Sequence, residues 1–152
     1  RTDLSASAGY GLVAGPAADG AWQVEHRAWQ QVQVDARLAP EAPARLTGRL
    51  RLEQRDLPGG WDLRLRLLAR GLLPVGRGGW GVSLWDEAFV TLDAPTAGFD
   101  QNRAFVGPYH QSAAGVRVEV GYLNLLRRDG TSGLTDSHVA SLQVSVGLRP
   151  RR

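Results

Sequence analysis

The sequence predicts an all-β fold, in which about eight antiparallel strands run up and down in series and close into a barrel. Three observations predict this fold. Apolar and polar residues alternate with a period of two along most of the 152 residues, no segment has helical periodicity, and turn-forming residues separate the alternating segments. A series of antiparallel strands avoids exposed sheet edges most simply by closing on itself.

The first four strands are predicted in the N-terminal half of the chain. Leu4–Ala14 and Glu25–Arg37 alternate with interruptions, whereas Arg45–Asp56 and Trp61–Arg70 alternate more regularly. In the last two segments, leucines take every second position over several residues and charged residues lie between them. This is the pattern of a strand with one apolar and one polar face.

The last four strands are predicted in the C-terminal half. Gly79–Leu92 and Asn102–Gln111 are less regular, whereas Val116–Tyr122 and Ala140–Leu148 place valine, leucine or alanine at alternate positions. The expected turns between the eight strands are Gly15–Gly20, Ala39–Ala44, Leu57–Gly60, Leu72–Gly78, Asp93–Phe99, Ser112–Gly115 and Arg128–Thr135.

The composition is that of a single folded domain, which we expect to cover residues 1–152. The chain has no Cys, so disulfides, thiolate metal sites and thiol nucleophiles are excluded. All 18 basic residues are Arg, and the net charge is +3. Because there is no Gly-rich phosphate loop, metal-ligand spacing or basic-aromatic run, we expect no cofactor, no metal and no nucleic-acid partner.

Alternation alone leaves open whether the apolar face points inward, as in a soluble barrel, or outward, as in a membrane barrel. Two features favour the membrane. The strands have about ten residues or more, and a tilted strand needs about 9–11 to cross a bilayer. Aromatic residues also gather near strand ends, where an interfacial girdle would lie. The girdle is predicted at Tyr10, Trp22, Trp61, Trp80, Tyr109 and Tyr122. Lipid contact is predicted for Leu50, Leu65, Val118 and Val144.

The alternative is a soluble barrel with an apolar ligand cavity, in which the same aromatic residues close the two ends. The two interpretations also place the polar face in different environments. In a soluble barrel it is a solvated exterior, and in a membrane barrel it is an interior of ion pairs, because Arg can bridge several acceptors.

The polar face is rich in arginine. Its expected arginines are Arg27, Arg37, Arg49, Arg51, Arg55, Arg64, Arg66, Arg70, Arg103 and Arg117. Its expected acids are Asp35, Glu53, Asp62, Glu87 and Glu119. Because an eight-stranded interior is only wide enough for side chains, we expect a plug and not a pore. The interior network is predicted to comprise Arg27, Gln31, Arg51, Glu53, Arg55, Arg64, Arg66, Glu87, Gln101, Arg103 and Glu119.

The surplus of positive charge leaves a second role open. If further strands widened the barrel, the arginines would line a narrow channel that favours anions. A structural barrel and such a channel are therefore both retained, and the identity of any ion or small-molecule cargo is not predicted.

A lipid hydrolase is the third possibility, and its residues do not support it. Ser137, His138 and Ser141 are close in sequence, but His138 and Ser141 are three positions apart and point to opposite faces of a strand. Asp86 and Glu87 are adjacent and also point apart, so they do not form a shared carboxylate site. We therefore expect no catalytic residues and no enzyme activity.

Six motifs in order carry a family resemblance. They are Glu25-His26-Arg27-Ala28-Trp29-Gln30-Gln31, Arg49-Leu50-Arg51-Leu52-Glu53-Gln54-Arg55, Leu63-Arg64-Leu65-Arg66-Leu67, Trp85-Asp86-Glu87-Ala88-Phe89, Gly98-Phe99-Asp100-Gln101-Asn102-Arg103 and Glu119-Val120-Gly121-Tyr122-Leu123-Asn124. The series resembles the bacterial outer-membrane β-barrel family known as domain of unknown function 2490.

The resemblance implies a cellular location and interaction partners, and it implies no activity. It implies a barrel in the Gram-negative outer membrane after signal-peptide export, in contact with outer-membrane lipid and the outer-membrane insertion machinery. Family members carry further strands before the matching segment, which leaves open that this chain is a C-terminal piece of a larger barrel. If the last strand ends in the periplasm, the turns at Gly15–Gly20, Leu57–Gly60, Asp93–Phe99 and Arg128–Thr135 face outside.

Overall fold

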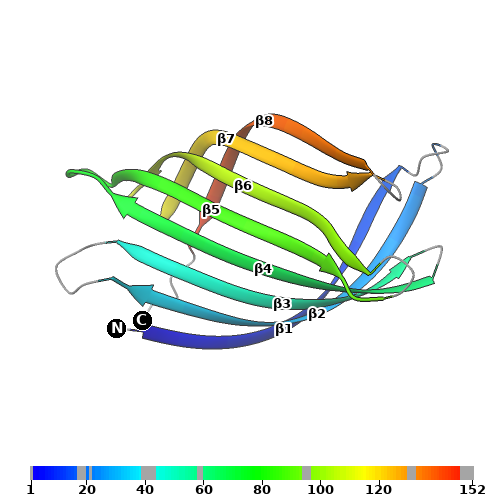
Figure 1. Cartoon of the computed structure of the whole chain (residues 1–152). Helices are drawn as coiled ribbons and strands as arrows, with labels where there is room; N and C mark the ends of the chain where they lie inside the picture. Colours follow the sequence, from blue (N-terminus) through cyan, green and yellow to red (C-terminus); the bar gives the residue numbers. More distant parts are fainter. Residues whose placement is uncertain are drawn as a thin grey trace.

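The computed structural model describes residues 2–16, 20, 22–38, 44–57, 60–93, 97–129 and 133–147. In this part of the chain the regular structure is eight strands in a single antiparallel sheet, ordered as in the sequence (Figure 1). The strands are β1 (Thr2–Pro16), β2 (Trp22–Arg37), β3 (Arg45–Leu57), β4 (Gly60–Pro74), β5 (Trp80–Thr91), β6 (Gly98–Gln111), β7 (Val116–Asp129) and β8 (Gly133–Val146). The predicted all-β, up-and-down architecture is confirmed.

Most strands are longer than the alternation predicted. β4 runs through Pro74 into the expected Leu72–Gly78 turn, and β7 and β8 continue into the expected Arg128–Thr135 turn, where Asp129 pairs with Gly133. The physical reason is that a backbone ladder continues wherever the neighbouring strand offers partners, and this pairing overrides the weak β-propensity of the residues concerned.

Two connections are fully described. Residues 75–79 join β4 to β5, and Ser112–Gly115 joins β6 to β7, as expected. Gly79 shows why glycine is needed in the first of them: its φ is +81°, and a Cβ there would lie 2.2 Å from the Gln111 carbonyl oxygen. The other five expected turns include residues that lie outside the described part of the chain.

The sheet is strongly curved, with β1 along one margin and β8 along the other (Figure 1). Within the described residues, β1 pairs only with β2 and β8 only with β7. We call the end of the sheet that holds the connections after β1, β3, β5 and β7 end A, and the opposite end, with the connections after β2, β4 and β6, end B. End A is on the right in Figure 1.

The register assigns each side chain to a face, because directly opposite residues of an antiparallel ladder point the same way. Trp29, Glu53, Arg64 and Thr91 are directly opposite one another across β2, β3, β4 and β5. Glu53, Arg64 and Thr91 are all buried. This set therefore marks the concave face, and the alternate residues mark the convex face.

The two faces have opposite character. The buried set among the described residues contains only three hydrophobic side chains, Phe89, Phe105 and Tyr109, beside the polar or charged Glu53, Arg64, Ser83, Glu87, Thr91, Gln101 and Glu119. Large hydrophobic side chains are instead exposed, mainly on the convex face. Leu50, Leu65, Val118 and Val144 lie on this face, as expected, and Leu50 and Val144 are exposed.

A close approach between β6 and β7 predicts the effect of one substitution. A Cβ on Gly121 would lie 2.3 Å from the Val106 carbonyl oxygen and 2.7 Å from the Gly107 Cα, both of which are backbone atoms. We expect Gly121→Val to lower the free energy of unfolding by about 1–3 kcal/mol, since the strands must separate to admit the side chain. Urea titration of the folded protein measures it.

Gly48 is the matched control for this substitution. It lies in β3 on the convex face, and a Cβ there would meet nothing within 4 Å. Gly48→Val is expected to leave the urea midpoint nearly unchanged. Equal midpoints for the two variants would contradict the close packing of β6 on β7.

Candidate functional site

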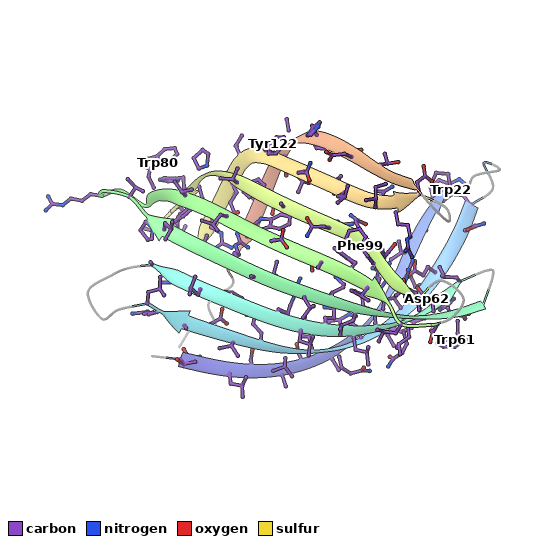
Figure 2. All side chains as sticks on the ribbon, in the orientation of Figure 1. Trp22, Trp61, Asp62, Trp80, Phe99 and Tyr122 are labelled. Carbon is purple, nitrogen blue, oxygen red and sulfur yellow. The ribbon has the colours of Figure 1, made fainter. Side chains whose placement is uncertain are left out.

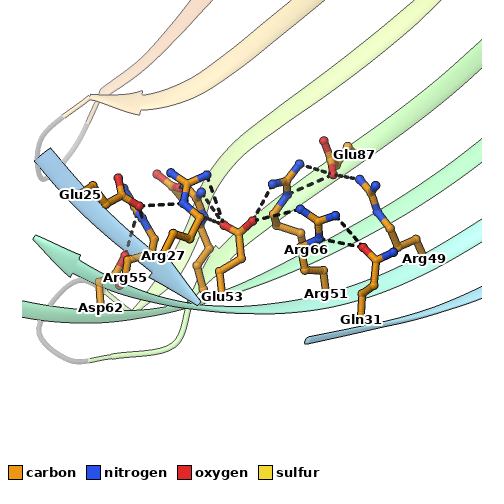
Figure 3. Close-up of polar contacts among 12 residues, drawn as sticks. Glu25, Arg27, Gln31, Arg49, Arg51, Glu53, Arg55, Asp62, Arg66 and Glu87 are labelled. Carbon is orange, nitrogen blue, oxygen red and sulfur yellow. Dashed lines mark hydrogen bonds and ion pairs between the residues drawn. The ribbon is translucent and has the colours of Figure 1, made fainter. Parts of the chain in front are cut away.

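A charged network covers the middle of the concave face, and Glu53 is its central acceptor (Figure 3). The Glu53 side chain is fully buried, at 0% exposure. Its Oε2 accepts from Arg64 Nε at 3.0 Å and Nη2 at 2.6 Å, and its Oε1 accepts from Arg66 Nη1 at 2.6 Å. Arg51 and Arg27 lie slightly farther away, at 3.7 and 4.0 Å. One carboxylate is therefore the shared counter-charge of several guanidinium groups.

Glu87 on β5 is the second acceptor of the network. Its Oε1 accepts from Arg49 Nη2 at 2.6 Å and from Arg66 at 2.8 Å (Nη2) and 3.1 Å (Nε). Arg66 thus bridges the two buried carboxylates Glu53 and Glu87 (Figure 3). Such bridging is the interaction for which the planar, five-donor guanidinium is suited.

Glu25 extends the network toward end A. It accepts from Arg27 Nε at 2.8 Å and from Arg55 at 2.7 Å (Nε) and 3.1 Å (Nη2). Arg55 also donates from Nη1 to Asp62 at 2.9 Å. The two parallel bonds from Arg55 to Glu25 form a fork, which fixes the orientation of both groups.

Two aromatic rings pack against the arginines. Phe89 is 1% exposed, and the guanidinium carbons of Arg64, Arg66 and Arg103 lie 5.2, 4.7 and 4.8 Å from its ring centroid. Arg51 lies 4.4 Å from the Trp29 ring. The negative face of each ring attracts these cations and offsets part of their mutual repulsion.

The structure places most of the predicted interior residues in this one network. Arg51 donates to Gln31 at 2.9 Å (Nε) and 2.6 Å (Nη2), and Gln101 has its amide oxygen toward Arg103, whose Nε lies 2.6 Å away. Glu119 is separate: it lies toward end B, where it pairs with Arg70 and where Arg117 Nε approaches its Oε1 at 2.8 Å. The predicted set therefore divides into a central network and a smaller cluster around Glu119.

Sequence reasoning missed several members of the network. Glu25 and Trp29 share the parity of Arg27, and Phe89 shares that of Glu87, so a complete reading of the alternation could have placed them. Asp100, whose Oδ2 lies 3.5 Å from Arg64 Nη1, is the residue of β6 that the register shift between β5 and β6 leaves without a partner on β5. Alternation contains no signal for such a shift.

Five of the six residues predicted for the aromatic girdle are exposed: Tyr10, Trp22, Trp61, Trp80 and Tyr122. Trp22 and Trp61 lie at end A and Trp80 at end B (Figure 2). Tyr109 is a correction. It is 6% exposed, lies opposite Glu119 and packs against Gly81, where a Cβ would come within 2.5 Å of its ring.

The convex face also carries polar pairs, most of which lie toward end A. Asn102 donates to Asp86 at 2.9 Å, Asn124 donates to Asp136 at 2.6 Å, and Gln30 is paired with Gln54 at 3.2 Å. Tyr10 is hydrogen-bonded to His26, and Tyr122 to His138. Toward end B, the convex side chains of β7 and β8 are Val116, Val118, Val120, Ala140, Leu142, Val144 and Val146.

The hydrolase residues are on different faces, as expected. Ser141 is opposite Gly121 in the ladder and on the concave face, whereas His138 is on the convex face beside Tyr122. Across the described ranges no three His, Asp or Glu side chains are grouped to hold a metal ion. The same residues include no helix with the length and hydropathy needed to cross a membrane.

The fold and its faces define an up-and-down antiparallel β-sheet protein with a charged concave face and an apolar convex face. The chain belongs to the family described as protein of unknown function (DUF2490), whose model matches residues 1–133, so the predicted family is confirmed. An uncharacterized protein of Methylorubrum extorquens is 33% identical over 132 residues, which cover 82% of this chain and 57% of that protein. The chain thus spans just over half the length of this relative. No solved structure matches.

Proposed function

We propose that this chain forms the wall of an outer-membrane β-barrel, with its convex face against lipid and its concave face toward a polar interior. One observation carries the proposal: charged side chains are buried on the concave face, and apolar side chains are exposed on the convex face. A soluble barrel of this size would fill its interior with apolar side chains, whereas here the fully buried groups include Glu53 and Glu119. Large exposed apolar surfaces mark contact with lipid or with another protein.

The strand lengths support lipid as the contact. The strands have 12 to 16 residues, and crossing a bilayer at a tilt takes about 9–11. The convex side chains are also smooth aliphatic groups over long runs, such as Leu142, Val144 and Val146 on β8. The motif resemblance that implies an outer-membrane barrel points the same way.

The polar pairs on the convex face limit how much of it meets lipid. Asp86, Asn102, Asn124 and Asp136 lie about three to five residues from end A, and charged groups on a lipid-facing surface are costly. We therefore place the convex face from end B up to these pairs in the bilayer, with the pairs at the border of the lipid-covered band. With the expected topology, end A projects outside the cell and end B faces the periplasm.

The proposal has a consequence for the two margins of the sheet. In lipid every backbone N–H and C=O must have a partner within the protein. The outer edges of β1 and β8 must therefore be paired in the membrane, either with each other or with further strands. The role that the central network supports best is structural, because Glu53 and Glu87 fill the concave face with satisfied ion pairs.

Cell fractionation tests the proposed function. The protein, expressed from its own gene in a Gram-negative host, is expected to sediment with outer membranes and to require detergent for extraction. Unboiled samples are expected to migrate differently from boiled ones on a gel, and depletion of the outer-membrane insertion machinery should abolish this difference. Recovery of the folded protein in the soluble fraction without detergent would overturn the proposal.

A further inference from the structure

We propose that the concave face at end B binds an anion that carries phosphate or carboxylate groups, through Arg45, Arg49, Arg70 and Arg117. The site lies between β3, β4 and β7, next to the central network, and shares Arg49 with it. It concerns only the concave face, so it holds independently of whether the convex face lies in lipid.

Two adjoining cavities provide the space. One has a volume of about 640 Å³ and the other of about 400 Å³, and Arg45, Leu72 and Arg117 line both. Small-molecule sites typically measure roughly 300–1,000 Å³. The larger cavity is further lined by Tyr109, Gln111 and Ser145, and the smaller one by Arg37, Arg49 and Arg70 among others.

The charges around the smaller cavity do not balance. Arg37, Arg45, Arg49, Arg70 and Arg117 line it, together with the acids Asp3 and Asp35. Asp35 accepts from two neutral donors, Gln33 Nε2 at 2.7 Å and Thr47 Oγ1 at 2.6 Å. These two hydrogen bonds of Asp35 therefore come from neutral side chains and not from the arginines around it.

Other carboxylates nearby are already engaged. Glu119 is paired with Arg70 and Arg117, and Glu87 with Arg49 and Arg66. Arg45 forms no ion pair with any described residue, and the same holds for Arg37. End B thus holds two arginines without a carboxylate partner among the described residues, beside three arginines that share Glu87 and Glu119.

Hydrogen-bond donors without an acceptor also indicate an anion site at end B. The Nε atoms of Arg49, Arg70 and Arg117 are buried without a hydrogen-bond acceptor in the described part of the chain. The Arg117 Nε is close to Glu119 but does not point along a hydrogen-bond direction, and the Oε2 of Glu119 also lacks a donor. Buried donors without acceptors are costly, and the oxygens of a phosphate or carboxylate would satisfy them.

Isothermal titration with inorganic phosphate, in a non-ionic detergent at low ionic strength, tests the site. Arg45→Gln is expected to weaken binding by about tenfold or more, as for the loss of a charge-assisted contact. Because Arg45 forms no ion pair with the described residues, this variant is expected to fold. Arg77→Gln is the control: it removes the same charge from an exposed position between β4 and β5 that lines neither cavity.

A second titration separates the two sources of the anion. Short-chain phosphatidylglycerol, added in the same detergent, carries the phosphate of a lipid headgroup. Tighter binding than inorganic phosphate, lost in Arg45→Gln, supports the site with a lipid headgroup as its ligand, and equal or weaker binding supports it with a free anion. The proposal is overturned if neither probe binds, or if Arg45→Gln and Arg77→Gln weaken binding equally. Neither result bears on the membrane location, which fractionation decides.

Discussion

Replacing Glu53 by alanine is expected to lower the free energy of unfolding by about 3–5 kcal/mol, because it leaves buried guanidinium groups without their counter-charge. Glu53 accepts three hydrogen bonds from Arg64 and Arg66 and is fully buried. Arg66 keeps Glu87 as a partner, but among the described residues Asp100, at 3.5 Å, is the one carboxylate that Arg64 keeps. Urea titration, read from the mobility of unboiled samples, measures the loss.

Two further variants make this result specific. Adding Arg64→Leu to Glu53→Ala is expected to recover part of the stability, since it removes the uncompensated charge. Asp136→Asn is the control: its side chain is 52% exposed near end A, and we expect a change within about 0.5 kcal/mol. A Glu53→Ala variant as stable as the Asp136→Asn variant would show that the network does not hold the sheet together.

Arginine in place of Leu142 is expected to lower the stability in lipid by about 2–4 kcal/mol, the cost of placing this charge on the lipid face of a barrel near the bilayer midplane. Leu142 is 68% exposed on the convex face toward end B. In a soluble protein, a substitution at so exposed a site costs at most about 0.5 kcal/mol. The variant therefore reports on the environment of the convex face. Urea titration in lipid vesicles measures it.

His138→Arg provides the comparison on the same strand and face. His138 lies nearer end A, beside Tyr122 and Asp136, at the border of the lipid-covered band. The substitution is expected to have little effect. If Leu142→Arg and His138→Arg were tolerated equally well, the convex face would not be embedded as proposed.

The strands and their faces could be predicted from the sequence because a period of two survives even where single residues deviate. Runs such as Leu50-Arg51-Leu52-Glu53 assign both faces at once, and each later polar contact of Arg51 and Glu53 follows from that assignment. The network itself was predictable as a set of inward residues. Its pairing was not, because Arg66 reaches Glu53 and Glu87 through a register that only the folded sheet defines.

The remaining differences have local causes. Tyr109 was placed in the girdle because it lies near a strand end, but it follows Gly107 and Pro108, which interrupt the alternation and conceal its parity. Asp100 reaches Arg64 from the position at which the register between β5 and β6 shifts. The uneven distribution of charge between the centre and end B also depends on three-dimensional pairing, since counting arginines and acids along the chain gives only the total.

A cysteine scan along β8 tests the central claim most directly, namely that the convex face toward end B lies in lipid. The chain has no Cys, so each introduced residue is the only labelling site for an environment-sensitive fluorophore. In vesicles with brominated lipid, we predict quenching at Leu142→Cys and Val144→Cys, and none at the concave Ser141→Cys and Gln143→Cys or at Asp136→Cys near end A. Quenching at none of these positions, or at all of them alike, would contradict the account.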